Sequence, residues 1–379
     1  MLCSLQLDDY RCFKKYRLDG LARVNLLVGK NNCGKTSVLE AIHFLASGGD
    51  PEVLNRTAWQ RGEIVVTGDD PERRRRSSDP AITHFFRGHE LVPDRHFRVR
   101  ADDGLGKVDV RVVSVADLEE QQSLFPELPA QPRFPDSDTR WQFALRIEGT
   151  RHPAAPSRLV VPLTDEGVIS PDWLRRYRHS PYLDREGVPP VQFITPDSLE
   201  PRSMSDMWDK VIIDGRESEA IDAMRILEPR LSNIFFLSGQ IAYRYGARTG
   251  ILAAFEGTRR RNPLGSYGEG MRRLLALSLS LIQAEGGILL VDEIDTGLHY
   301  SIMGDMWRLV TEAAKKADVQ VFATTHSFDC VKGLAWLCEN YPHVQTEVSL
   351  QKIDSNLERA VALDAEEIMM AVDQGMEVR

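Results

Sequence analysis

The stretch GKNNCGKTSVLEAI, Gly29 to Ile42, decides how this chain folds. The six residues before it, RVNLLV, are apolar and β-prone, which predicts a short buried strand. After it, apolar residues recur at helical spacing as far as Leu45, and a Gly-Gly pair at positions 48 and 49 supplies a stop. The predicted order is strand, glycine-rich loop, helix, which indicates an α/β fold.

The loop fits the pattern G-x-x-x-x-G-K-[ST] in full. Its backbone N–H groups can surround a phosphate chain, and the helix that opens at Lys35 adds its positive N-terminal end. Lys35 would reach the β and γ oxygens, and the Thr36 hydroxyl would bind Mg²⁺, which prefers oxygen ligands. The alternative is a chance glycine-rich turn. The predicted nucleotide contacts are Gly29, Asn31, Asn32, Cys33, Gly34, Lys35, Thr36 and Ser37.

A second apolar strand is predicted at Ile288–Val291, and it ends in the acidic pair Asp292-Glu293. Two carboxylates at a strand end are costly to bury without a cation or a donor nearby. Asp292 is therefore predicted to hold the metal through its water shell, and Glu293 to polarise an attacking water. A purely structural use of both acids is the alternative.

Two further segments flank this strand along the chain. Ser266 to Gly270 opens a mostly apolar helix, and such a helix start exposes N–H groups suited to an anion. Downstream, the apolar strand VQVFA ends in Thr324-Thr325-His326-Ser327. A histidine at the carboxyl edge of a parallel sheet, beside the proposed metal acids, is a candidate phosphate sensor, although a lone histidine is more often a structural residue.

In order and content, these four motifs resemble the ABC-type ATPase head domains of the SMC and RecF class. Within that class, SYGEGMRRLL, DEIDTGLHYS and TTHS look most like the overcoming-lysogenization-defect (OLD) family of ATPases. The resemblance covers roughly residues 1–48 and 186–354. It implies a P-loop NTPase fold with a helical signature lobe, hydrolysis of ATP with Mg²⁺, and a head-to-head homodimer formed on ATP.

The resemblance also implies roles for single residues. Glu293 and His326 would be catalytic. The metal would be held by Thr36, Asp292 and Gln192. The nucleotide of the partner copy would be contacted by Ser266, Gly268, Glu269 and Asp295. The signature departs from LSGGQ, with Gly265 for leucine and Tyr267 for the first glycine, which leaves the contact across the dimer open in detail. Arg11 or Phe13 is expected either to contact adenine or to be structural.

The domain prediction is a discontinuous head, residues 1–48 and 186–379, with a β-rich insertion at 49–185. The Pro-rich segment 124–139 and the charged segment around Arg73–Arg76 are expected to be exposed loops. A second basic run, Arg259–Arg261, is expected to face either solvent or DNA. No heptad pattern predicts the long coiled coil of SMC proteins.

Composition bears on the cellular compartment of the protein and on its possible partners. The 379 residues carry a net charge of −9, which neither demands nor excludes a nucleic-acid partner. Five cysteines without metal-ligand spacing favour reduced thiols in the cytoplasm. The N-terminus does not read as a signal peptide, and no apolar run approaches the length of a membrane span.

The sequence features bear on four possible functions. The favoured function is an ATPase that controls a separate effector. The effector is expected to be a Toprim-like nuclease on another polypeptide, because no room for a Toprim domain follows His326. The resemblance to OLD-family ATPases implies a role in bacterial anti-phage defence. The alternative is a RecF-like DNA-repair ATPase that binds DNA as an ATP-gated clamp. A stand-alone nuclease is disfavoured because the sequence shows no carboxylate cluster beyond the ATP site. A membrane transport role is disfavoured because the motifs resemble the SMC and RecF class of ABC-type ATPases and not the subtype found in transporters.

Overall fold

The structure is a computed structural model, and it describes residues 1–67, 77–102, 104–115, 142–150, 157–179, 187–195, 201–225, 228–237 and 250–376. Two predicted features, the basic run Arg73–Arg76 and the Pro-rich segment 124–139, lie outside these residues.

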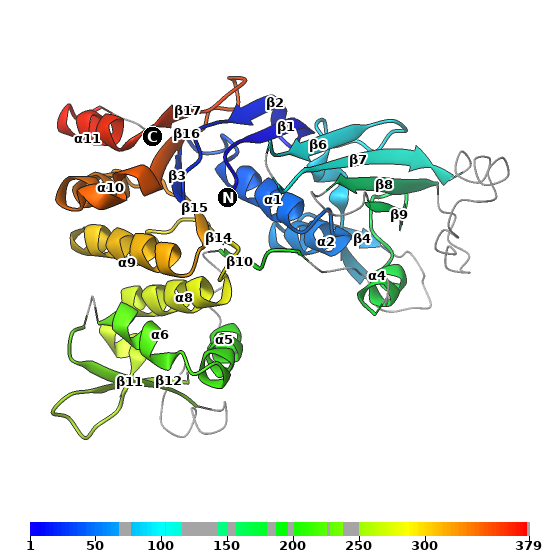
Figure 1. Cartoon of the computed structure of the whole chain (residues 1–379). Helices are drawn as coiled ribbons and strands as arrows, with labels where there is room; N and C mark the ends of the chain where they lie inside the picture. The colour runs from blue at the N-terminus through cyan, green and yellow to red at the C-terminus, as the bar shows by residue number, and fades with distance from the viewer. Residues whose placement is uncertain are drawn as a thin grey trace.

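A six-stranded, mostly parallel sheet forms the centre of the described molecule (Figure 1). Its β17 alone runs antiparallel to its neighbour β16. In spatial order the strands are β10 (Val191–Ile194), β14 (Ile288–Val291), β15 (Gln320–Thr324), β3 (Val24–Val28), β16 (Val348–Lys352) and β17 (Val361–Leu363). β3, β14 and β15 are buried along their whole length, as expected for strands of a parallel sheet covered on both faces.

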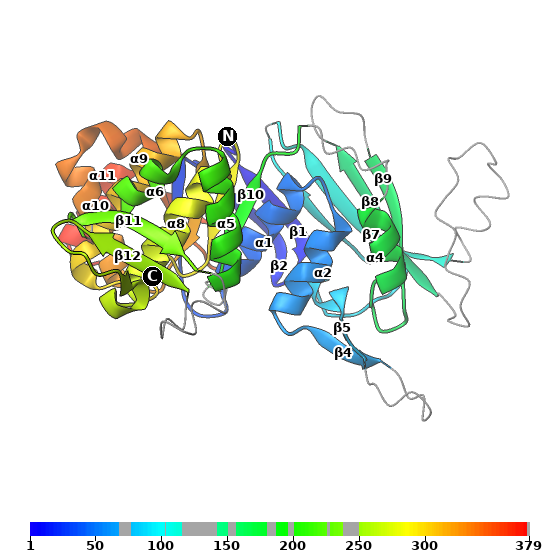
Figure 2. The ribbon, with the colours of Figure 1, turned by 90° about the horizontal axis from the view of Figure 1, so that it is seen from below.

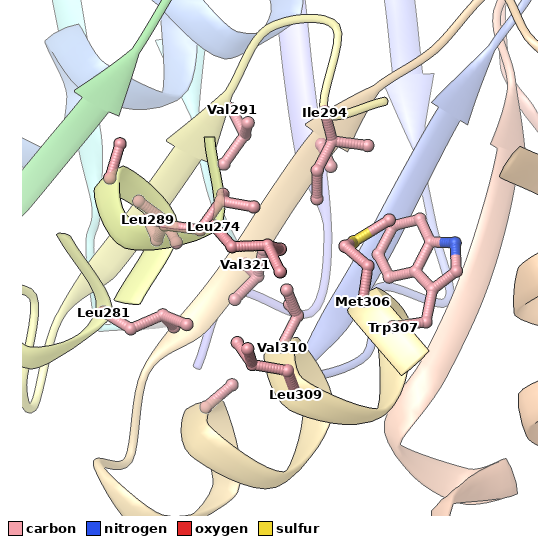
Figure 3. Close-up of a cluster of buried hydrophobic side chains, with 14 of the residues drawn as sticks. Leu274, Leu281, Leu289, Val291, Ile294, Met306, Trp307, Leu309, Val310 and Val321 are labelled. Carbon is pink, nitrogen blue, oxygen red and sulfur yellow. The ribbon is translucent and has the colours of Figure 1, made fainter. Parts of the chain in front are cut away.

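Helices cover both faces of this sheet. On one face, Leu289, Val291 and Val321 pack against side chains of α8 and α9, as Figure 3 shows. On the other face, Leu290 and Phe322 pack with α1 (Lys35–Ala46). The helices on the first face and at the C-terminus are α8 (Glu269–Gln283), η3 (Tyr300–Ile302), α9 (Met303–Lys316), α10 (Phe328–Asn340), η4 (Pro342–Glu347) and α11 (Ala365–Asp373). The α/β fold predicted from the sequence is confirmed.

A second sheet of six antiparallel strands packs over the outer side of α1 (Figure 2). Its aromatic side chains reach the helix, since the Phe44 and Phe97 rings lie 6.0 Å apart. In spatial order the strands are β2 (Phe13–Leu18), β1 (Leu5–Tyr10), β6 (His96–Arg100), β7 (Lys107–Ser114), β8 (Phe143–Thr150) and β9 (Ser157–Leu163). The same region contains α2 (Pro51–Gln60), β4 (Ile64–Thr67), β5 (Ser77–Pro80), η1 (Ile82–Phe85) and α4 (Pro171–Arg178).

The second sheet crosses the boundary that the sequence placed between residues 48 and 49. β1 pairs directly with β6, with Leu7 opposite Val99, and both strands contribute to one hydrophobic core with α1. The N-terminal hairpin and the β-rich segment therefore form one sheet, and the proposed boundary between residues 48 and 49 stays a prediction.

A small lobe carries the start of α8. Its helices α5 (Pro201–Ile213) and α6 (Glu217–Met224) pack against α8, and the Trp208 ring stacks on Phe236 at 5.4 Å. Its remaining elements are β11 (Leu231–Phe236), β12 (Ile251–Phe255), β13 (Asn262–Pro263) and η2 (Leu264–Tyr267). Among the described helices, none combines the length and the apolar character that crossing a lipid bilayer requires.

Candidate nucleotide site

The glycine-rich loop leaves β3 and enters α1 in a conformation that depends on its glycines. Gly29 and Gly34 have φ values of 146° and 99°, a region that side chains rarely adopt. A side chain at Gly29 would also collide with the Ile353 carbonyl oxygen, and one at Gly34 with the Phe13 ring. The local fold therefore requires glycine at both positions of the motif.

Lys35, the first residue of α1, folds its side chain back into this loop. Its Nζ donates to the carbonyl oxygens of Gly29 at 2.8 Å and Lys30 at 3.0 Å, and lies 3.5 Å from His326 Nδ1. Burial lowers the pKa of Lys35, while the nearby thiol of Cys33 and the carboxylates of Asp292 and Glu293 act in the opposite direction. This largely buried ammonium donates mainly to backbone carbonyl oxygens. The oxygens of a phosphate are charged and therefore stronger acceptors, so the ammonium is well suited to donate to a phosphate.

Thr36 and Asp292 meet although they are 256 positions apart in the chain. The Thr36 hydroxyl donates to the Asp292 carboxylate at 3.0 Å, and the Thr324 hydroxyl from the neighbouring strand donates to it at 2.5 Å. Hard oxygen donors of this kind fit Mg²⁺, which protein sites commonly hold through one or two side chains together with water and substrate phosphates. In the described part of the chain no group of three or more His, Cys, Asp or Glu could hold a metal ion. The donor set thus fits a Mg²⁺ that depends on nucleotide oxygens to complete its shell.

Glu293 follows Asp292 in a left-handed backbone conformation, with φ of 50°. Its N–H donates to Thr324 Oγ1 at 2.9 Å, and its own carboxylate accepts a hydrogen bond from the Thr296 hydroxyl at 3.2 Å. Such a conformation is uncommon for a residue with a side chain and persists where neighbouring contacts impose it. The backbone turn directs Glu293 into the cavity that the loop borders.

That cavity has a volume of about 860 Å³ and lies at the carboxyl edge of β3, β14 and β15. Ligands of open α/β sheets bind at this edge. The cavity is lined by Arg11, Cys12, Asn31, Asn32, Cys33, Gly34, Lys35, Thr36, Ser37, Arg61, Glu63, His84, His89, Glu293 and His326. The structure therefore brings most of the predicted loop residues together with Glu293 and His326, and Gly29 and Asp292 join them through hydrogen bonds to Lys35 and Thr36.

The predicted signature residues do not line this cavity. Ser266 lies in η2, and Gly268 and Glu269 lie at the start of α8, where Gly268 has φ of 92°. Asp295 is held by the Thr325 hydroxyl at 2.5 Å. The loop that follows Asp295 touches the signature, because a side-chain carbon at Gly297 would lie 3.0 Å from Glu269 Cγ.

The prediction that Gln192 serves the metal is wrong for this structure. Gln192 lies inside β10, level with Leu289 of β14, which is three residues before Asp292 and thus about 10 Å away at the rise of a strand. Its neighbours Val191 and Phe193 pack on the α1 side of the sheet, so alternation turns Gln192 to the opposite face. The sequence placed Gln192 near an expected junction, whereas in the structure it lies inside a strand that continues to Ile194.

The far wall of the cavity was largely missed by the sequence analysis. Arg11 pairs with Glu40 at 2.8 Å and Glu63 at 2.6 Å, and its guanidinium lies 4.2 Å from the centre of the Phe85 ring. Arg61 also pairs with Glu40, at 2.5 Å. The sequence leaves two roles open for Arg11, a contact with adenine and a structural role. In the structure Arg11 lines the cavity and also belongs to a buried ion network. The one available signal was Glu40, an acidic residue on a helix that is otherwise largely apolar.

His84 and His89 complete this wall, with Nδ1 atoms 3.1 Å apart. No motif marks either residue. They belong to the segment between β5 and β6, which reaches the cavity because it bonds to the end of β1, where the Arg11 N–H donates to the Phe85 carbonyl oxygen at 3.0 Å. Their placement follows from tertiary structure.

Comparisons with known proteins agree with this site. Residues 24–329, well over half of the chain, match the family described as "AAA domain, putative AbiEii toxin, Type IV TA system". An "ATP/GTP phosphatase" from Helicobacter pylori is 20% identical over 88% of this chain and 87% of its own length. The match to the DNA replication and repair protein RecF of Clostridioides difficile is local, with 51% identity over 12% of this chain and 13% of the relative.

Among solved structures, the Smc head domain with an extended coiled coil bound to the C-terminal domain of ScpA, from Pyrococcus furiosus, covers 98% of each chain at 12% identity and a TM-score of 0.46. The phosphate loop, the strand-end acids and the family match together lead to one conclusion. This chain belongs to the AAA-domain family just described, and it is a P-loop ATPase.

Proposed function

We propose that this chain is an ATP-driven switch whose two copies close head to head on ATP and Mg²⁺ and reopen after hydrolysis. In this cycle Lys35 and the loop N–H groups bind the phosphates, and Thr36 and Asp292 hold Mg²⁺, which supplies charge neutralisation when bound. Glu293 acts as general base toward the attacking water, and His326 contacts the terminal phosphate.

One observation carries the proposal. The cavity gathers Lys35, Thr36, Glu293 and His326 from segments nearly 300 residues apart, yet Ser266, Gly268 and Glu269 lie outside it. A helix start with exposed N–H groups suits an anion, and within the described residues it does not line the cavity that the phosphate loop borders. A second copy related by a two-fold axis offers that anion, since each signature then faces the other copy's phosphates.

Complementation between two inactive variants tests this arrangement. Lys35→Met removes the phosphate contact of one copy, and Ser266→Arg blocks the signature of the other. Each variant alone is expected to be inactive, whereas an equal mixture should recover up to about a quarter of wild-type phosphate release, because half of the dimers are mixed and each has one complete site. The measurement is steady-state phosphate release at fixed total protein.

The matched control is a mixture of Lys35→Met with a second inactive loop variant, Thr36→Ala, in which no dimer has a complete site. This mixture should remain inactive. A mixture of Lys35→Met and Ser266→Arg that forms no mixed dimers on ATP would show that the composite site does not exist, whereas mixed dimers without activity would show that hydrolysis at one site needs the other site to be complete.

The output of the switch is proposed to be a separate effector, a Toprim-like nuclease, in bacterial anti-phage defence and within the cytoplasm. The motifs SYGEGMRRLL and TTHS support this by their resemblance to OLD-family ATPases. The description of the matched family names a toxin of a type IV TA system.

A second candidate function is a DNA clamp of RecF type, favoured by the local matches to RecF. The surface in question is the basic run Arg259–Arg261, in which Arg261 lies 3.9 Å from the centre of the Phe235 ring. Under this alternative, the triple change of Arg259, Arg260 and Arg261 to alanine should weaken duplex DNA binding and reduce its salt slope by up to about 3, since each lost phosphate contact removes roughly one released counterion.

Fluorescence anisotropy with a labelled DNA duplex, measured at several salt concentrations with and without ATP, checks this prediction. The control is the pair Arg175→Ala/Arg176→Ala on α4, which removes positive charge elsewhere. Duplex binding that is unchanged in the triple variant would exclude this surface.

A further inference from the structure

Arg273 is a buried cation in the middle of the nucleotide machinery. It lies on α8, one helical turn after Glu269, and its side chain is 0% exposed. Its Nη2 donates to two successive carbonyl oxygens, those of Asp292 at 2.9 Å and Glu293 at 2.8 Å. Arg273 thus connects the helix that begins at the signature to the two acids of the cavity.

A packing role alone does not account for this residue. Arg273 Nε and Nη1 are buried and find no hydrogen-bond partner among the described residues. Its neighbours Leu274, Leu275 and Leu277 are core residues, so an apolar side chain would fill the position without the cost of burying unsatisfied donors. Burial lowers the pKa of Arg273, although the carboxylates of Asp295, Asp292 and Glu293 favour its charged form.

The position of Glu293 depends on this contact. Three groups bond the backbone of the left-handed turn at Glu293. Thr324 accepts its N–H, the Thr296 N–H donates to its carbonyl oxygen at 3.1 Å, and Arg273 donates to the same oxygen and to that of Asp292. Arg273 is the one of the three that lies on α8. Because φ above 0° is unfavourable for glutamate, loss of the Arg273 bonds lets the backbone relax and moves the carboxylate. A movement of α8 would be transmitted to Glu293 through the same guanidinium.

We propose that Arg273 is a positioning residue that couples the signature of each chain to its own Glu293, so that engagement of Ser266–Glu269 by the partner's nucleotide places Glu293 for hydrolysis. The coupling rests on the proposed head-to-head dimer. It links the two nucleotide sites, because the signature that completes one site sits on the helix that orients the general base of the other. The unsatisfied Nε and Nη1 donors leave Arg273 free to change acceptors when α8 moves.

Arg273→Met tests the coupling by separating binding from chemistry. The substitution leaves the phosphate loop intact, so ATP affinity and ATP-dependent dimerisation are expected to stay within about twofold of wild type, while kcat falls by roughly 10–100-fold. Arg273→Lys, which retains a donor for the two carbonyls, should recover part of the lost kcat. A residue that only supports the fold would instead change affinity, dimerisation and thermal stability together.

The matched control is Arg308→Met on α9, which removes a guanidinium that bonds the Tyr341 hydroxyl and should leave kcat unchanged. Wild-type kcat in Arg273→Met, with the dimer intact, would overturn the coupling and leave the proposed switch standing. A wild-type protein that stays monomeric with ATP would remove the dimer and the coupling with it.

Hydrogen–deuterium exchange keeps the proposal testable if Arg273→Met fails to fold. In Glu293→Gln protein loaded with ATP, the segments 266–270 and 292–296 are expected to gain protection in parallel as ATP is titrated. Protection of 266–270 without any change at 292–296 would overturn the coupling.

Discussion

Glu293→Gln is expected to slow ATP hydrolysis by roughly 10²–10⁴-fold, the range typical of losing a general base. Glutamine keeps the size of the side chain and can still accept a hydrogen bond from Thr296, but it cannot take a proton from water. Binding should survive, because Lys35 and Thr36 belong to the loop and to α1. ATP that binds without being hydrolysed should then hold the closed dimer.

Two measurements check this outcome. Single-turnover phosphate release reports the chemical step, and light scattering on the ATP-loaded variant reports its mass. Glu339→Gln, on the exposed side of α10, is the matched control and should behave like wild type. An ATP-loaded Glu293→Gln protein that remains monomeric would contradict the head-to-head cycle, whereas rapid hydrolysis by the variant would remove Glu293 from the role of base.

The local parts of this site could be predicted from the sequence because their geometry is local. Gly29 and Gly34 adopt backbone conformations that glycine favours, and Lys35 opens the helix that follows. Asp292 could be placed because it directly follows a fully apolar strand, and the residue after such a strand lies at the carboxyl edge of a parallel sheet. Its contact with Thr36 then follows, since β15 alone separates β3 from β14.

The remaining parts depend on contacts that no local pattern encodes. Gln192 was misplaced because the sequence does not mark where its strand ends, and β10 continues two residues beyond it, so that Gln192 lies inside the strand and not at its carboxyl edge. Arg61, His84 and His89 reach the cavity through the bonding of the segment between β5 and β6 to the end of β1 and through an ion network around Glu40. Arg273 looks like an ordinary helix-surface arginine in the sequence, and only its burial and its bonds to two carbonyls separate it from Arg272.

Lys35→Met is expected to weaken ATP binding by about 10²–10⁴-fold, because charge-assisted hydrogen bonds contribute about 1.5–3 kcal/mol each and the ammonium can make two to a triphosphate. Without nucleotide the variant should be at least as stable as wild type. Burial lowers the pKa of Lys35, which means that the folded state disfavours the charged form, so an apolar side chain of similar length relieves that cost.

Titration with a fluorescent ATP analogue measures the affinity, and thermal unfolding of the nucleotide-free protein measures the stability. Lys332→Met, which removes an exposed lysine on α10 that pairs with Asp329, is the matched control for both. The opposite signs of the two expected changes separate a lost phosphate contact from a damaged fold, because damage would lower affinity and thermal stability together. Unchanged affinity in a stable Lys35→Met protein would mean that nucleotide is held elsewhere, and the loop from Gly29 to Thr36 would lose its assignment as the phosphate site.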